Sequence, residues 1–195
     1  MNVNERLLDY AERLSTALQT VDPKQLAKAY CKLKSAYLSR RDVYVCGNGG
    51  SLSMSENFVV GHGKGLQYDT DLNPRIQSLT SSPLISAIAN DVGYDYIFSY
   101  QIEMKGNQDD VLIAISASGN SPNIIKALTT AKEKELITIA FVGFDGGKAK
   151  EIADIVIHVE EDNYGIIEDA HQSVMHILAQ SLREEFHSKK KALKL

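Results

Sequence analysis

The first forty residues carry two apolar stripes at helical spacing. In "NERLLDYAERLSTALQ" the apolar side chains that share one helical face are Leu7, Leu8, Ala11, Leu14 and Leu18. In "VDPKQLAKAYCKLKSAYL" the apolar face is formed by Leu26, Ala29, Tyr30, Leu33 and Tyr37. Asp22 stands at the N-cap position of this second pattern and Pro23 at its first helical position. The sequence therefore predicts two amphipathic helices within residues 1–40.

After residue 42 the helical spacing gives way to short runs of β-branched and other apolar residues. These runs are "VYVC" at 43–46, "VLIAI" at 111–115, "TIAFV" at 138–142, "IVIHV" at 155–159 and a weaker "RIQSL" at 75–79. Helical patterns separate them, including "SPNIIKALTTAKEKE" and a final one over 166–187. Unbroken apolar strands that alternate with helices are typical of a parallel sheet covered on both faces. We predict a three-layer α/β/α sandwich over 41–188, followed by a basic tail at 189–195.

Composition narrows the class of protein. The 195 residues fit one domain, and the 44% of apolar residues is typical of a globular protein. A formal charge of −4 argues against a nucleic-acid partner. No apolar run reaches the roughly 18 residues of a membrane span, and "MNVNERLLDY" does not resemble a signal peptide. Cys31 and Cys46 lack metal-type spacing, so we expect buried free thiols and a cytoplasmic protein.

Two loops that follow predicted strands are rich in glycine and serine. They are "CGNGGS" at 46–51 and "SASGNS" at 116–121, and each precedes a helix. Ligands of open α/β sheets bind at the carboxyl ends of strands, where glycines expose N–H groups and helix N-termini attract anions. Each loop alone is equally well explained as a tight turn in which Ser51 or Ser121 caps the helix. Two matched loops favour a phosphate site, and neither fits a P-loop or a dinucleotide-binding motif.

Several motifs together resemble the phosphoheptose isomerases, a branch of the sugar isomerase (SIS) domain family. The resemblance is carried by "CGNGGS", "AIANDVGYDYIFSYQIE", "DVLIAISASGNSPNIIKAL", "VGFDGGK" and "EDAHQSVMHIL", and it covers nearly the whole chain as a single SIS domain, 1–195. It implies a homotetramer with sites between subunits, and a ketose-to-aldose isomerisation through an enediol. The substrate-binding positions it implies are Asn48, Gly49, Gly50, Ser51, Asn90, Asp91, Ser116, Ala117, Ser118 and Ser121. Ala117 replaces the threonine that is usual between the two serines.

The resemblance fails at most of the positions it assigns to catalysis and to zinc. The family's histidine and glutamate, four residues apart on one helix, are Asn57 and Gly61 here, and a family glutamine is Glu168. His176 alone matches. We therefore expect no metal held in the family's manner, although the resemblance itself points to zinc. A catalytic zinc needs about three protein ligands.

Isomerisation moves a proton between adjacent carbons and needs a base, which glycine cannot be. We expect Glu168 and His176 to form the catalytic pair. His62 is a further candidate, because the glycines of "GHGKG" could end the helix and let it swing toward the site. The role of His171 is left open. Two functions compete: a phosphosugar isomerase, favoured by the retained pocket, and a non-catalytic phosphosugar-binding sensor or scaffold, favoured by Gly61. The sequence does not identify the sugar.

Overall fold

Five parallel strands form one sheet at the centre of the computed structural model, which describes residues 2–187. The strand order is β2-β1-β3-β4-β5. The strands are β1 (Asp42–Gly47), β2 (Arg75–Ser78), β3 (Val111–Ser116), β4 (Ile137–Val142) and β5 (Ile155–His158). The expected parallel sheet is confirmed, and each predicted run becomes a strand. The basic tail predicted at 189–195 lies outside the described residues.

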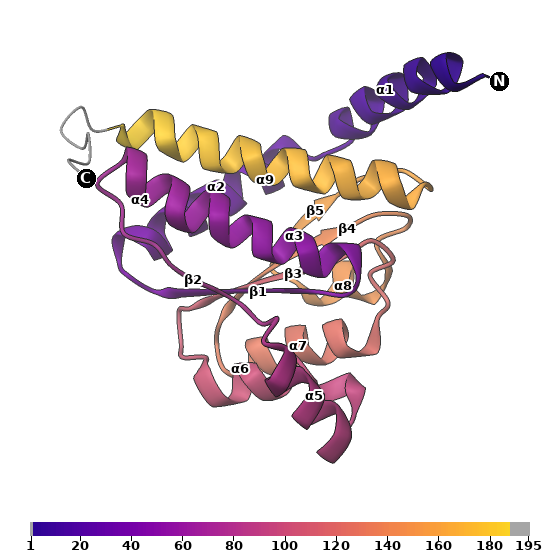
Figure 1. Cartoon of the computed structure of the whole chain (residues 1–195). Helices are drawn as coiled ribbons and strands as arrows, with labels where there is room; N and C mark the ends of the chain where they lie inside the picture. The colour runs from indigo at the N-terminus through magenta and orange to yellow at the C-terminus, as the bar shows by residue number, and fades with distance from the viewer. Residues whose placement is uncertain (1, 188–195) are drawn as a thin grey trace.

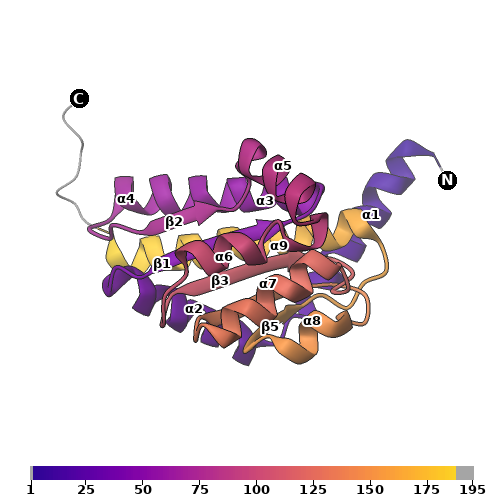
Figure 2. The same cartoon turned by 90° about the horizontal axis from the view of Figure 1, so that it is seen from below.

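Helices cover both faces of the sheet (Figures 1 and 2). The helical segments of the first half are α1 (Val3–Gln19), α2 (Pro23–Leu38), α3 (Gly50–Phe58), the π-helix η1 (Val59–Gly65), α4 (Leu66–Asp69) and α5 (Ser82–Asp91). Those of the second half are the 3₁₀ turn η2 (Tyr94–Tyr96), α6 (Ser99–Lys105), α7 (Pro122–Glu133), α8 (Gly147–Ile152) and α9 (Tyr164–Phe186). The three-layer sandwich is confirmed. Within residues 2–187, no helix combines the length and the apolar character needed to cross a bilayer.

The alternation of side chains along each strand divides the hydrophobic core into two clusters, one on each face of the sheet. Successive side chains of a strand point to opposite faces. Val43 and Val45 of β1 therefore pack in the layer of α2, α3 and α9, whereas Tyr44 and Cys46 pack in the layer of α5, α6 and α7. Every residue of β3 is buried, as a strand covered on both faces requires.

The N-terminal helices begin where the sequence places them. Asp22 caps α2 by accepting a hydrogen bond from Lys24 N, and Pro23 is the first helical residue.

The expectation that both cysteines are buried is wrong for Cys31, which is exposed, whereas Cys46 is buried. Helix α2 buries the face that carries Ala29 and Leu33. Cys31 lies two residues from each, about 200° around the helix, and so points away from the core.

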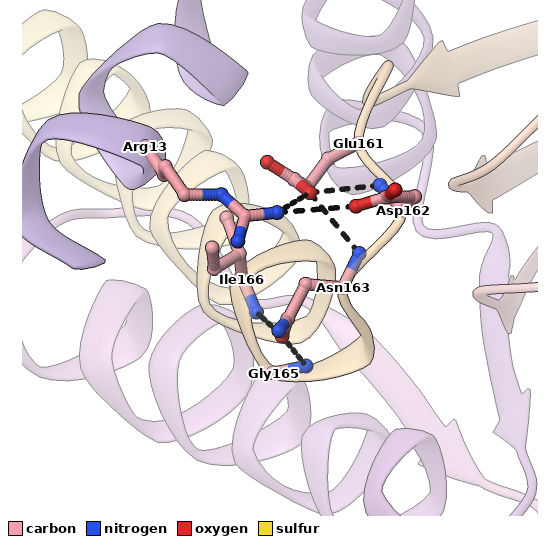
Figure 3. Close-up of polar contacts among 6 residues, drawn as sticks. All are labelled: Arg13, Glu161, Asp162, Asn163, Gly165 and Ile166. Carbon is pink, nitrogen blue, oxygen red and sulfur yellow. Dashed lines mark hydrogen bonds and ion pairs between the residues drawn. The ribbon is translucent and has the colours of Figure 1, made fainter. Parts of the chain in front are cut away.

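Helix α1 extends beyond the rest of the molecule (Figure 1), and its middle contacts the beginning of α9 and the segment that precedes it. Tyr10 Oη donates a hydrogen bond of 2.8 Å to Asp169. Arg13 forms ion pairs with Glu161 and Asp162, which precede α9 (Figure 3). Burial raises the pKa of Glu161, but hydrogen bonds from Arg13 and from Asp162 outweigh it, and the net shift is downward.

Candidate functional site

The two glycine- and serine-rich loops meet at one edge of the sheet because β1 and β3 are neighbours. Between them lies a cavity of about 160 Å³. Its walls are formed by Asn48, Ser51, Ile115, Ser116, Ala117, Ser118, Ser121, Tyr164 and Glu168. The structure thus brings together six of the ten predicted binding residues and the predicted catalytic Glu168. Gly49 and Gly50 belong to the same turn and start α3.

The serine side chains of the cavity are not used to cap helices. Gly49, not Ser51, occupies the N-cap position of α3. Ser121 is at the N-cap of α7, but its side chain makes no capping hydrogen bond. The capping explanation is therefore wrong for Ser51, whereas Ser121 does occupy the N-cap position of its helix, but caps it through its backbone alone. With α3 and α7 both beginning at the cavity, serine hydroxyls and the positive ends of two helix dipoles meet there, which suits a phosphate.

The serine- and glycine-rich loop at 116–121 is packed closely against the residues that begin α8. Gly119 has φ +62°, a conformation that side chains disfavour, and a Cβ there would overlap the carbonyl oxygen of Gly146. Asn120 donates to Ser118 O at 3.0 Å and accepts from Lys148 N at 3.1 Å. The beginning of α8 thus packs against this loop and hydrogen-bonds to it.

A reciprocal pair of amides joins the two loops. Asn48 Nδ2 donates to Asn123 Oδ1 at 2.9 Å, and Asn123 Nδ2 donates to Asn48 Oδ1 at 2.9 Å. Tyr94 Oη also donates to Asn48 Oδ1, at 3.3 Å. Asn123 and Tyr94 were not singled out from the sequence. The sequence does place Asn123 in the first turn of the helix that follows the serine loop, and this position could have marked it as a residue near the site.

The carboxylate of Glu168 is placed directly over the first turn of α3. A Cβ on Gly50 would lie 2.6 Å from Glu168 Oε1 and 2.7 Å from Oε2. Glycine at this position is what allows the acidic side chain to lie in the cavity. Tyr164, one turn earlier on α9, forms another part of the wall and packs edge-on against Phe144. It too was missed from the sequence.

The beginning of α9, which carries Tyr164 and Glu168, is fixed from outside the cavity. Asn163 caps the helix by accepting from Gly165 N and Ile166 N (Figure 3). Glu161 accepts from the backbone N–H groups of Asp162 and Asn163 and is paired with Arg13 of α1. Helix α1 therefore supports the wall of the cavity through the segment 161–163.

His176 lies two turns beyond Glu168 on α9, about 12 Å along the helix axis. It is exposed, and its Nε2 accepts a hydrogen bond of 3.0 Å from Gln172 Nε2. Gln172 Nε2 also donates to Asn57 Oδ1 at 3.4 Å. Asn57, Gln172 and His176 thus form a polar cluster between α3 and α9, and none of the three lines the cavity. The expected direct pairing of Glu168 with His176 is not among the hydrogen bonds and ion pairs of the described residues.

The idea that the helix ends at "GHGKG" and releases His62 is wrong. The chain continues as the π-helix η1, and His62 is buried. It stacks on Phe58, donates from Nε2 to Met175 O at 3.0 Å and accepts from Tyr37 Oη at 3.0 Å. Burial lowers the pKa of His62 to about 4. It is a neutral core histidine.

His171 is likewise a core residue. Its Nε2 donates to Val142 O at 3.1 Å, and its buried Nδ1 has no hydrogen-bond partner among residues 2–187. Burial lowers its pKa to about 4. Asn90 and Asp91, by contrast, are exposed at the end of α5, outside the cavity walls, where Asn90 donates to Asp91. Their expected contact with the sugar stays a prediction.

Comparisons with known proteins agree with this geometry. Residues 7–143 match the SIS domain family. The chain is 32% identical over 187 residues to a phosphoheptose isomerase of Helicobacter pylori, covering 96% of this chain and 97% of the relative. It is also 35% identical over 176 residues to a phosphoheptose isomerase of Citrifermentans bemidjiense, and the match covers 90% of this chain and 92% of that relative. The solved phosphoheptose isomerase of Neisseria gonorrhoeae superposes with a TM-score of 0.84 at 27% identity, covering 94% of this chain and all of that one.

Proposed function

Because the chain belongs to the SIS-domain family, among the phosphoheptose isomerases, we propose that it isomerises a phosphorylated ketose to the aldose. The observation that carries the proposal is the cavity in which Ser51, Ser116, Ser118 and Ser121 converge beside two helix N-termini. Hydroxyls and N–H groups of this kind bind a dianion without an arginine. A seven-carbon ketose phosphate is the substrate class that the relatives favour.

We propose that Glu168 is the base that moves the proton between the two reacting carbons. Of the described residues that line the cavity, it is the one that carries a carboxylate. A bound phosphate would repel it from its place over Gly50, since like charges a few ångströms apart repel. The carboxylate would then turn from the phosphate toward the sugar chain. His176, further along the same helix, would exchange protons with the sugar oxygens.

The test of this assignment is Glu168→Gln, which keeps the shape of the side chain and removes its charge. With sedoheptulose 7-phosphate as substrate, we expect turnover to be lost. Binding should be retained or tightened, because the repulsion of the phosphate is gone. Calorimetry measures the affinity and aldose formation measures the rate. Wild-type turnover by the variant would reject Glu168 as the base.

A second variant separates an isomerase from a phosphosugar-binding protein. Restoring Asn57→His and Gly61→Glu together with Glu168→Gln rebuilds the residues that the resemblance implies. A side chain can start at Gly61 without a clash, because within residues 2–187 no atom outside the adjoining residues and the helix's own backbone lies within 4 Å of a Cβ placed there. If only the rebuilt chain isomerises and the native chain turns over no ketose phosphate, the native protein is a sensor or scaffold and not an enzyme.

We also propose that no zinc is held in the manner that the resemblance implies. The side chains of Asn57 and Gln172 are neutral amides, and Gln172 occupies Nε2 of His176. Over the part of the chain that is described, no cluster of three or more His, Cys, Asp or Glu is placed to hold a metal ion. The donor set therefore does not fit zinc. One zinc per subunit, found by elemental analysis of protein purified without added metal, would contradict this.

For the assembly we propose a cytoplasmic homotetramer with the sites near subunit interfaces. Val3, Leu7 and Leu8 of the projecting α1 are 84%, 67% and 72% exposed. Apolar side chains on such an arm are covered when a second subunit packs against it. Free cysteines suit a reducing compartment. Sedimentation at micromolar concentration should give a tetramer, and a monomer would refute the assembly.

A further inference from the structure

The Asn48 side chain lines the cavity, and its amide has a defined orientation. An asparagine amide offers one oxygen with two lone pairs and one nitrogen with two hydrogens. The oxygen accepts from Asn123 and from Tyr94, which uses both lone pairs. The nitrogen donates one hydrogen to Asn123. Among the described residues, the second side-chain N–H of Asn48 is therefore the hydrogen-bonding group of this amide that has no partner.

Asn123 couples the orientation of its own amide to that of Asn48. It is 1% exposed and belongs to the first turn of α7, two residues after Ser121. Its own amide meets that of Asn48 across 75 residues of sequence, oxygen to nitrogen in both directions. Turning one amide over alone would bring two oxygens and two nitrogens together, so the two amides can turn only as a pair. In the observed arrangement Asn48 Oδ1 also accepts a hydrogen bond from Tyr94 Oη, which belongs to this orientation of the pair.

We infer that Asn123 is a positioning residue, which holds Asn48 so that it presents an N–H donor to the phosphate of the substrate. If the Asn48 amide were reversed, it would present a carbonyl oxygen to an anion. Asn123 also fixes the distance between the two loops that carry the serines. The inference rests on the proposed phosphate-binding role of the cavity and assigns to Asn123 a part in it.

Two variants of the full-length chain test the inference, with inorganic phosphate as the probe and calorimetry as the measurement. In Asn123→Leu the new side chain is similar in size to asparagine but makes no hydrogen bond. The variant therefore releases Asn48 without adding a charge. We expect phosphate affinity to fall by about 10-fold or more, the cost of a lost hydrogen bond to a charged group. In an Asn48→Ala background, Asn123→Leu should cause little further loss, because Asn123 acts through Asn48.

Asn123→Asp supplies a pH signature that a purely structural role would not give. The carboxylate that predominates near pH 8 repels Asn48 Oδ1, and binding should be weak. The neutral acid that forms near pH 5 donates to Asn48 Oδ1 and accepts from Asn48 Nδ2, which restores the pair. The ratio of wild-type to variant affinity should therefore shrink as the pH falls. Asn123→Leu should show no such recovery.

Asn107→Asp is the matched control, because it makes the same change at an exposed site where the amide donates to Lys105 O. It should bind phosphate as the wild type does at every pH. If the wild type binds phosphate and folded Asn123→Leu binds it equally well, or if the losses from Asn48→Ala and Asn123→Leu simply add, the inference is overturned. Failure of the wild type to bind phosphate would overturn the site as a whole. Binding without turnover would refute only the isomerase.

Discussion

Replacing Ser121 by alanine distinguishes a ligand-binding hydroxyl from a helix cap. Ser121 occupies the N-cap of α7, where a capping serine contributes about 1 kcal/mol to stability. Here only its backbone acts in that way, by accepting from Ile124 N and Ile125 N at 3.0 Å each. Ser121→Ala should therefore lower the free energy of unfolding by less than about 0.5 kcal/mol, as for a surface substitution.

The effect on phosphate binding should be much larger. A hydrogen bond to a charged group contributes about 1.5–3 kcal/mol. Loss of the Ser121 hydroxyl should therefore weaken the binding of sedoheptulose 7-phosphate and of inorganic phosphate by about 10- to 150-fold. Calorimetry gives the affinities, and urea unfolding gives the stability. Both ligands should lose affinity by a similar factor, since the hydroxyl is expected to contact only the phosphate.

Ser81→Ala is the control for this experiment. Ser81 is the N-cap of α5, again without a capping hydrogen bond from its side chain, and it does not line the cavity. It should change neither the stability nor the affinity appreciably. If Ser121→Ala binds phosphate as tightly as the wild type, the cavity is not the phosphate site. A stability loss of about 1 kcal/mol with unchanged affinity would show that the hydroxyl is a cap after all.

Two further predictions concern stability. Burial holds the pKa of His62 and of His171 at about 4, below the value of about 6.5 in the unfolded chain, so the unfolded chain binds more protons in this interval. Stability should therefore fall as the pH is lowered from about 6.5 to about 4, by on the order of 3 kcal/mol per histidine. Folded His171→Leu should show a smaller dependence of stability on pH in urea titrations. A dependence equal to that of the wild type would contradict the assignment. Gly119→Ala should cost about 1–3 kcal/mol and weaken phosphate binding, because its Cβ would overlap Gly146 O at an unfavourable φ. Gly63→Ala is the control, because the nearest described side chain to a Cβ there is Val59, at 3.8 Å. Equal losses in the two variants would argue against the overlap.

The strands and the serine loops could be predicted from the sequence because their signals are local. Apolar runs and the glycines and serines that follow them are visible in short windows, and neighbouring parallel strands bring such loops to one edge. The fate of His62 could not be predicted in this way. Three glycines disfavour a helix, but stacking on Phe58 and hydrogen bonds with Tyr37 and Met175 O stabilise it. Tertiary contacts here outweigh intrinsic propensity.

The partners within the cavity were also beyond the reach of the sequence. That Glu168 lies over Gly50, and that Asn123 pairs with Asn48, depends on how α7 and α9 are placed against the turn that begins α3. No local pattern fixes that placement. The apolar stripes did locate the helices, but not the neighbour that each polar side chain would meet.

The close packing of Gly119 against Gly146 has a consequence for the directed evolution of this cavity. A side chain at residue 119 would collide with backbone, which cannot move aside as a flexible side chain can. Gly147 is restricted in the same way, because a Cβ there would lie 2.5 Å from Ser118 O. A library that seeks new substrates should therefore keep these three glycines and vary the wall at Tyr164 and Ala117. Variation at 116–121 without regard to 146–147 would yield mostly misfolded loops, and would understate how many sugars the scaffold can accept.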